Sequence, residues 1–302
     1  MIADTPSPFW RQMSQHHTRL LSEQGFAEFK RTVNRRYFQW DASHVRGPLF
    51  WTVALHWLKH PTWRIVTVRF PDYAPHFTWL GSRLYALYVA LLYEAVDSPL
   101  LSLEEPDIGH PFRIWYRGHW TSQDRCNAVH EYEAVMKRLP ITLMGSILDH
   151  GLNVLEIGAG YGRVADVFLN RQPECRYTIV DIQPALNLAA KYLFQLHPEA
   201  RLTYLAPSQM EAITYKSIDV AVVISAFHEM TQEQVTEYFK ELQRVCRGVV
   251  YVKHWRKGRA EINNWLPSEH DYPIPATWRT LYHRRHPLQP MFFHALYEVA
   301  NG

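Results

Sequence analysis

A glycine-rich turn carries the clearest chemical signature in this 302-residue sequence, with the pattern E-x-G-x-G-x-G over residues 156–162. The run before it, residues 153–157, is short and apolar, which is typical of a buried parallel strand. After it, the apolar positions of residues 161–170 recur at helical spacing. Glycine lets the backbone turn tightly beside a ligand, and the free N–H groups of the following helix point toward the turn. The pattern indicates a nucleoside site, although a glycine turn without a ligand is the structural alternative.

The chemistry of this ligand is narrowed by two acidic residues. Asp181 ends a second apolar run, residues 177–180, about twenty positions beyond the turn, where a carboxylate can accept from both hydroxyls of a ribose. A dinucleotide fingerprint has the spacing G-x-G-x-x-G, which differs from the spacing here. Glu156 precedes the first glycine by two residues and would repel a pyrophosphate, but it could hold the ammonium group of a methionine moiety, directly or through water. S-adenosylmethionine (SAM) is therefore favoured over a dinucleotide.

A candidate general base follows the fourth predicted strand, residues 218–225. Ligands of open α/β sheets lie beyond the carboxyl ends of the strands, so residues 225–230 should face the substrate. Because the methyl donor is already activated, the enzyme supplies alignment and removes a proton from a hydroxyl acceptor. His228 suits that role because imidazole titrates near neutral pH. A packed or helix-capping histidine is the alternative.

Other polar residues near this edge have more open interpretations. Glu229 could pair with a basic neighbour or a metal, or be solvated at a helix start. His254, directly after the fifth predicted strand, is a second candidate base. The loop over residues 256–275 is expected to cover the pocket, and its Glu269 and Asp271 could orient an imidazole or hold a divalent ion. No metal-ligand spacing is present, so no metal site is predicted.

The remaining sequence predicts an α/β domain preceded by a mostly helical region. Helices are expected over residues 8–24, 49–58 and 82–96, and a Thr121-x-x-Asp124 capping box is expected to open a helix ending near residue 138. That helix carries Arg125, Asn127, His130 and Glu131, which suit either a site or a solvated face. Further strands are predicted over residues 202–205, 248–253, 278–282 and 291–299, with helices over residues 183–196 and after Thr231. The predicted domains are 1–142 and 143–302.

Composition limits the classes of function. The sequence has a formal net charge of +3 and scattered basic residues, so a nucleic-acid partner is not expected. Three cysteines far apart argue against a disulfide framework and favour a reducing cytoplasm. Neither a secretory signal nor a segment long enough to span a bilayer is visible, so no membrane association is expected.

At the motif level, the chain resembles the class I SAM-dependent methyltransferases. The segments 9–10, 25–34, 37–40, 156–163, 180–186 and 228–230 together look like the sugar O-methyltransferases of bacterial glycan and secondary-metabolite pathways, although this chain has Gln183 where that family often has proline. The resemblance implies a seven-stranded Rossmann-like sheet with an antiparallel C-terminal hairpin. It also implies His228 as base, while Glu229 and His254 are further catalytic candidates because of their positions after the fourth and fifth predicted strands. The implied SAM contacts are Glu156, Gly158, Gly160, Arg163, Asp181, Ile182, Gln209, Met210 and Ser225.

These observations predict an O-methyltransferase acting on a hydroxyl of a sugar, a glycoside or a related small molecule. The helical N-terminal region would cover the acceptor site and could provide contacts for a homo-oligomer. Two alternatives stay open. The mildly basic pI of 8.7 and the clusters at residues 256–259 and 283–286 would suit an RNA or protein methyltransferase, and a SAM-binding module without catalysis would show the same glycine turn.

Overall fold

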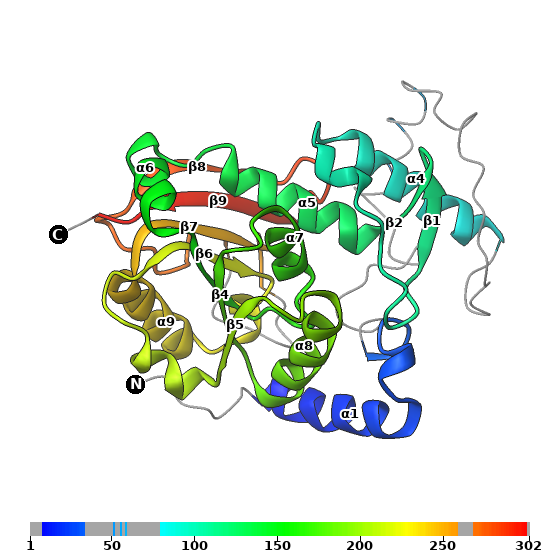
Figure 1. The fold of residues 1–302 in the computed structure, drawn as a ribbon, viewed down its shortest axis with the longest axis horizontal. Coiled ribbons are helices and arrows are strands. Elements are labelled where there is room, and N and C mark those ends of the chain that lie inside the picture. Colours follow the sequence, from blue (N-terminus) through cyan, green and yellow to red (C-terminus); the bar gives the residue numbers. More distant parts are fainter. Residues whose placement is uncertain are drawn as a thin grey trace. The chain divides into compact units, whose positions relative to one another are not determined.

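The computed structural model describes residues 8–33, 51, 55, 58, 79–258 and 268–300. The chain divides into two compact units, one made of Met1–His16 with Ala134–Gly302 and the other of His17–Glu133 (Figure 1). Each unit is described by itself. Most of the predicted helix over residues 49–58, the aromatic segment 37–40 and the middle of the predicted covering loop, residues 259–267, lie outside the described residues.

The larger unit is built on a seven-stranded sheet with the order β5-β4-β3-β6-β7-β9-β8. Strands β3 to β7 pair in parallel, whereas β9 is antiparallel to both β7 and β8. The predicted α/β fold class with its antiparallel C-terminal hairpin is therefore confirmed. The strands are β3 (Asn153–Ile157), β4 (Arg176–Val180), β5 (Arg201–Leu205), β6 (Ile218–Ile224), β7 (Cys246–Trp255), β8 (Arg279–Arg285) and β9 (Phe292–Glu298).

Helix α6 (Ile141–His150) precedes the sheet, and the parallel strands are then joined by crossover connections. These contain α7 (Arg163–Arg171), α8 (Gln183–Leu196), the 3₁₀ turns η5 (Pro207–Ala212) and η6 (Phe227–Glu229), and α9 (Gln232–Val245). All seven residues of β6 are buried, which explains why six of them are apolar; the exception, Asp219, forms an ion pair with Arg247. The predicted cap of α9 is confirmed, because the Gln234 N–H donates to Thr231 Oγ1 and the Thr231 N–H to Gln234 Oε1.

The smaller unit contains a two-stranded hairpin that the sequence did not predict. Strands β1 (Arg113–Tyr116) and β2 (His119–Ser122) pair antiparallel and lead directly into α5 (Gln123–Met136). The predicted Thr121 cap is wrong, because Thr121 belongs to β2 and Ser122 Oγ accepts from the Arg125 N–H instead. The other elements of this unit are η1 (Phe26–Glu28), α4 (Trp79–Glu94) and η4 (Pro99–Ser102), and helix α1 (Pro8–Gln24), as predicted, is divided between the two units at His16.

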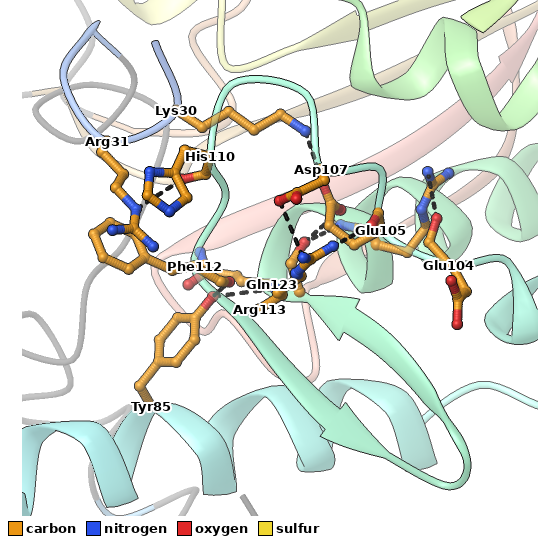
Figure 2. Close-up of polar contacts among 12 residues, drawn as sticks. Lys30, Arg31, Tyr85, Glu104, Glu105, Asp107, His110, Phe112, Arg113 and Gln123 are labelled. Atoms are coloured by element: carbon orange, nitrogen blue, oxygen red, sulfur yellow. Dashed lines mark hydrogen bonds and ion pairs between the residues drawn. The ribbon is translucent and has the colours of Figure 1, made fainter. Parts of the chain in front are cut away.

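A buried ion pair joins distant parts of this smaller unit. Lys30 Nζ lies 2.5 Å from Glu105 Oε1, with both side chains almost fully buried, and Ser122 Oγ donates to Glu105 Oε2 at 2.7 Å. Figure 2 shows Lys30 reaching from the residues that follow η1 into the loop before β1. Because a buried charge is costly without a partner, this network fixes the segment around Lys30 against that loop.

None of the helices that the structure describes is both long enough and apolar enough to cross a membrane.

Candidate functional site

The glycine turn lies between the end of β3 and the start of α7. Gly158 has a φ of +75°, and a Cβ built there would lie 2.5 Å from Ala226 Cβ, so only glycine fits without displacement. Its N–H donates to Val180 O at the end of β4. Gly162 has a φ of +90°, and helix α7 therefore begins at Arg163, two residues later than predicted. The turn contacts the end of β6, where the candidate base follows.

Asp181 bridges the end of β4 to this turn. Its two carboxylate oxygens accept from the Gly160 N–H at 3.0 Å and from the Ile182 N–H at 2.7 Å. Burial raises the pKa of Asp181 to about 7, the two backbone N–H groups oppose that shift, and the negative charge of Glu229 adds to it. The carboxylate that was predicted to bind the ribose is thus placed beside the turn, within electrostatic reach of the predicted catalytic segment.

Glu156 is buried within β3, and a residue that sequence reasoning missed holds it in place. The Tyr177 hydroxyl, on the neighbouring strand β4, donates to Glu156 Oε2 at 2.8 Å. Burial and the Glu156 carboxylate together raise the pKa of Tyr177 well above its usual range. Tyr177 pairs in register with Val154, which puts it on the same face of the sheet as Glu156, and the sequence alone does not give this register.

The other predicted SAM contacts differ in how accessible they are. Arg163 is the first residue of α7, and Ile182 precedes α8 directly, both half-buried. Gln209 lies in η5, where its Oε1 accepts from the Ala206 N–H, so the acceptor expected to contact adenine already has a backbone partner. Met210 is 1% exposed and packs in the hydrophobic core. Of these four, Arg163 and Ile182 are the ones that adjoin the turn or Asp181.

The segment after β6 has a strained start. Ser225 is a non-glycine residue with a φ of +54°, and its N–H donates to Lys253 O on β7. Backbone strain of this kind clusters at functional sites, because the surrounding structure must hold it in place. It directs the chain into η6, which contains His228 and Glu229. His228 Nε2 lies 3.5 Å from Glu229 Oε1, and both residues are buried.

His254 lies beside this pair, at the end of β7. The ring centroids of His228 and His254 are 5.9 Å apart, and Tyr272 stacks on His254 at 5.3 Å. His254 is fully buried, and neither of its ring nitrogens has a hydrogen-bond partner among the residues that the structure describes. Burial and the neighbouring His228 hold the pKa of His254 well below its usual range. The structure thus brings all three catalytic candidates together, with the Tyr272 ring as an unpredicted neighbour.

The predicted covering loop is described only at its two ends. Glu269, one of its two acidic residues, forms an ion pair with Arg256, so a cation on the protein already partners its carboxylate. Asp271 is exposed, and its N–H donates to Ser268 O. Across the described ranges, no three histidine, cysteine or acidic side chains gather where they could hold a metal ion.

The sequence left two interpretations of the polar face of α5, a functional site or a solvated face. The structure excludes the solvated face. Arg125, Asn127 and Glu131 are each at most 6% exposed, and His130 Nε2 hydrogen-bonds to Leu92 O at 2.6 Å. Arg125 Nη2 donates to Glu104 O. Arg125 and His130 thus form contacts within the smaller unit, and a sequence pattern could not distinguish such burial from surface exposure.

We compared the chain with known protein families and proteins. Residues 155–248 match the family model described as a methyltransferase domain. The malonyl-acyl-carrier-protein O-methyltransferase of Anoxybacillus flavithermus (strain DSM 21510 / WK1) is 28% identical over 125 residues, which cover 41% of this chain and 47% of that relative. The matched region therefore spans about half the length of the curated relative.

Two solved structures show the extent of the structural likeness. A SAM-dependent methyltransferase from Aquifex aeolicus is 16% identical, with 52% of this chain and 89% of that chain covered and a TM-score of 0.39. A geranyl diphosphate C-methyltransferase from Streptomyces coelicolor A3(2) is 10% identical, with 53% and 76% covered and a TM-score of 0.39. The match over residues 155–248 indicates a methyltransferase domain in this part of the chain.

Proposed function

We propose that this protein is a SAM-dependent O-methyltransferase that uses His228 as its general base. The contact between Gly158 and Ala226 carries the proposal, because it brings the glycine turn against the chain two residues before His228. Glu229 supports it independently, since its charge acts on the pKa of Asp181. The groups that would hold the cofactor and the group that would take the proton thus converge at the carboxyl ends of β3, β4 and β6.

The residues of the turn fit the chemical groups of SAM. The Asp181 carboxylate would accept from the ribose hydroxyls, and the Glu156 carboxylate, held by Tyr177, would attract the ammonium group. SAM supplies an electrophilic methyl group on a sulfonium. An acceptor hydroxyl beside His228 would give its proton to the imidazole as the new carbon–oxygen bond forms and the carbon–sulfur bond breaks, and S-adenosylhomocysteine would leave.

Glu229 would assist by stabilising the charged imidazole. At 3.5 Å the contact between His228 Nε2 and Glu229 Oε1 is longer than a good hydrogen bond, but an ion pair forms there when His228 is protonated. His254 is the weaker candidate for the base, because its lowered pKa makes it a poor proton acceptor near neutral pH. Its neutral ring would contribute packing beside the acceptor.

The acceptor that we propose is a hydroxyl of a sugar, a glycoside or a related small molecule. The family resemblance of the motifs supports this choice, and the Trp255 ring beside His228 suits the face of a sugar ring. The decisive assay incubates the protein with labelled SAM and a panel of activated sugars, glycosides and phenols. Methyl transfer only to nitrogen or to RNA would refute this acceptor, and tight SAM binding without transfer to any acceptor would indicate a binding module.

The base assignment has its own test. We expect His228→Ala to lower kcat about a hundredfold or more, because general base catalysis acts only as the proton leaves. SAM affinity, measured by calorimetry, should stay nearly unchanged. His150→Ala, which removes an exposed histidine at the end of α6, is the matched control and should retain wild-type kcat. A His228→Ala variant with near-wild-type kcat across pH would make His254 the next residue to test.

A further inference from the structure

Helix α6 presents large apolar side chains to solvent. Ile141, Met144 and Leu148 are 87%, 49% and 87% exposed, and their spacing of i, i+3 and i+7 places them in one stripe along the helix. The opposite side of the helix is the one that packs, since Leu143 is buried and its Cδ2 lies 2.7 Å from where a Cβ on Gly248 would be. The stripe therefore adds nothing to the core of its own unit.

The stripe has the symmetry of a surface that pairs with itself. Its midpoint falls between Met144 and Gly145, with Ile141 and Leu148 at equal distances on either side. In an antiparallel pair of α6 helices related by a two-fold axis through this midpoint, Ile141 of one copy meets Leu148 of the other. Gly145 is exposed with open space where a Cβ would stand, so the two helices can approach closely.

The charges at the two ends of α6 favour the antiparallel arrangement. Exposed Lys137 and Arg138 precede the helix, and exposed Asp149 lies at its end. Antiparallel pairing puts the acidic end of each copy beside the basic end of the other, whereas parallel pairing would put like charges together. The helix macrodipoles also oppose each other favourably in the antiparallel pair.

We propose that the α6 stripe of Ile141, Met144 and Leu148 is a homodimer interface that pairs with the same stripe of a second copy of this chain. One face of a ten-residue helix is smaller than the roughly 800 Å² per partner of a standard interface. The expected state is therefore a monomer–dimer equilibrium that depends on protein concentration. The proposal does not depend on the acceptor or the base assigned above.

Sedimentation equilibrium of the full chain is the first test. The wild type should associate reversibly to a dimer and no further, and Leu148→Lys should remain monomeric over the same concentrations. Thr142→Lys is the matched control, because Thr142 is exposed on the same helix but about 100° around it from Ile141, and it should dimerise like the wild type. Circular dichroism should show both variants folded, since each changes an exposed position. A wild type that stays monomeric throughout, or that forms open-ended assemblies, would overturn the proposal.

Disulfide trapping tests the two-fold axis directly. Met144→Cys lies beside the axis and should form a covalent dimer on mild oxidation, whereas Thr142→Cys should not. The three native cysteines are at most 1% exposed and should not interfere. Equal trapping of both variants, or trapping of Thr142→Cys alone, would show that α6 does not pair in this way.

Discussion

The titration of Asp181 makes the proposed cofactor site testable through pH. A carboxyl group in an unfolded chain has a pKa near 3.9, whereas burial raises the pKa of Asp181 to about 7 in the folded protein. Ribose hydroxyls donate to an ionised carboxylate more strongly than to a protonated one. SAM affinity should therefore be constant above about pH 8 and fall by up to about tenfold per pH unit below pH 7.

Asp181→Asn removes both the charge and the titration. Losing hydrogen bonds to a charged group should weaken SAM binding by about 1.5–3 kcal/mol at pH 8, which is roughly a tenfold to 150-fold rise in Kd. Calorimetric titration of wild type and variant at a series of pH values isolates the effect, because ionisation of the ligand itself is common to both. Glu229→Gln should move the midpoint to lower pH, since the Glu229 charge contributes to the raised pKa. Parallel pH profiles for wild type and Asp181→Asn would refute the assignment of Asp181 to the ribose.

The same shift predicts how the stability of the cofactor-free protein depends on pH. The folded state holds the Asp181 proton up to about pH 7, whereas the unfolded chain releases it near pH 4. The contribution of this group to the free energy of unfolding is thus complete below pH 4 and is lost as pH rises to 7. Denaturant unfolding should show this loss in the wild type relative to Asp181→Asn. An unchanged difference between the two proteins across that range would contradict the raised pKa.

Three further substitutions test how the structure supports the site and the smaller unit. Gly158→Ala should destabilise the protein by about 1–3 kcal/mol and weaken SAM binding, because its Cβ meets Ala226 at a positive φ; adding Ala226→Gly should recover only the steric part in a denaturant titration. Lys30→Met should cost about 3–5 kcal/mol of unfolding free energy by leaving the Glu105 carboxylate buried without its cation, and a loss below about 1 kcal/mol would show that the pair is not buried in solution. His254→Phe should keep thermal stability close to the wild type, because within the described ranges neither ring nitrogen has a hydrogen bond to lose, and a kcat fall as large as that of His228→Ala would instead make His254 essential to proton transfer.

Local signals were sufficient for the elements that carry the predicted site. The alternation of largely apolar runs and helical periodicity located β3, β4, β6 and β7 with the helices between them, because a parallel sheet covered on both faces requires strands that are mostly apolar. The glycine turn and Asp181 were identifiable because a positive φ and a carboxylate at a strand end are properties of a few adjacent residues. The first residues of helices were harder to locate. Helix α7 begins only after Gly162, whose backbone is left-handed, and the periodicity of the apolar residues in α7 could not show this.

Contacts between distant residues were decided only by the tertiary structure. Tyr177 holds Glu156 across two strands, Gly158 fits only because Ala226 lies against it, and the polar face of α5 turned out to be buried. The sequence could name His228 and His254 as candidate bases but could not rank them. Their difference arises from the low-dielectric surroundings of His254, which disfavour its charged form. Those surroundings are assembled from strands and loops far apart in the chain, so the pKa of each histidine is a property of the fold rather than of its neighbours in sequence.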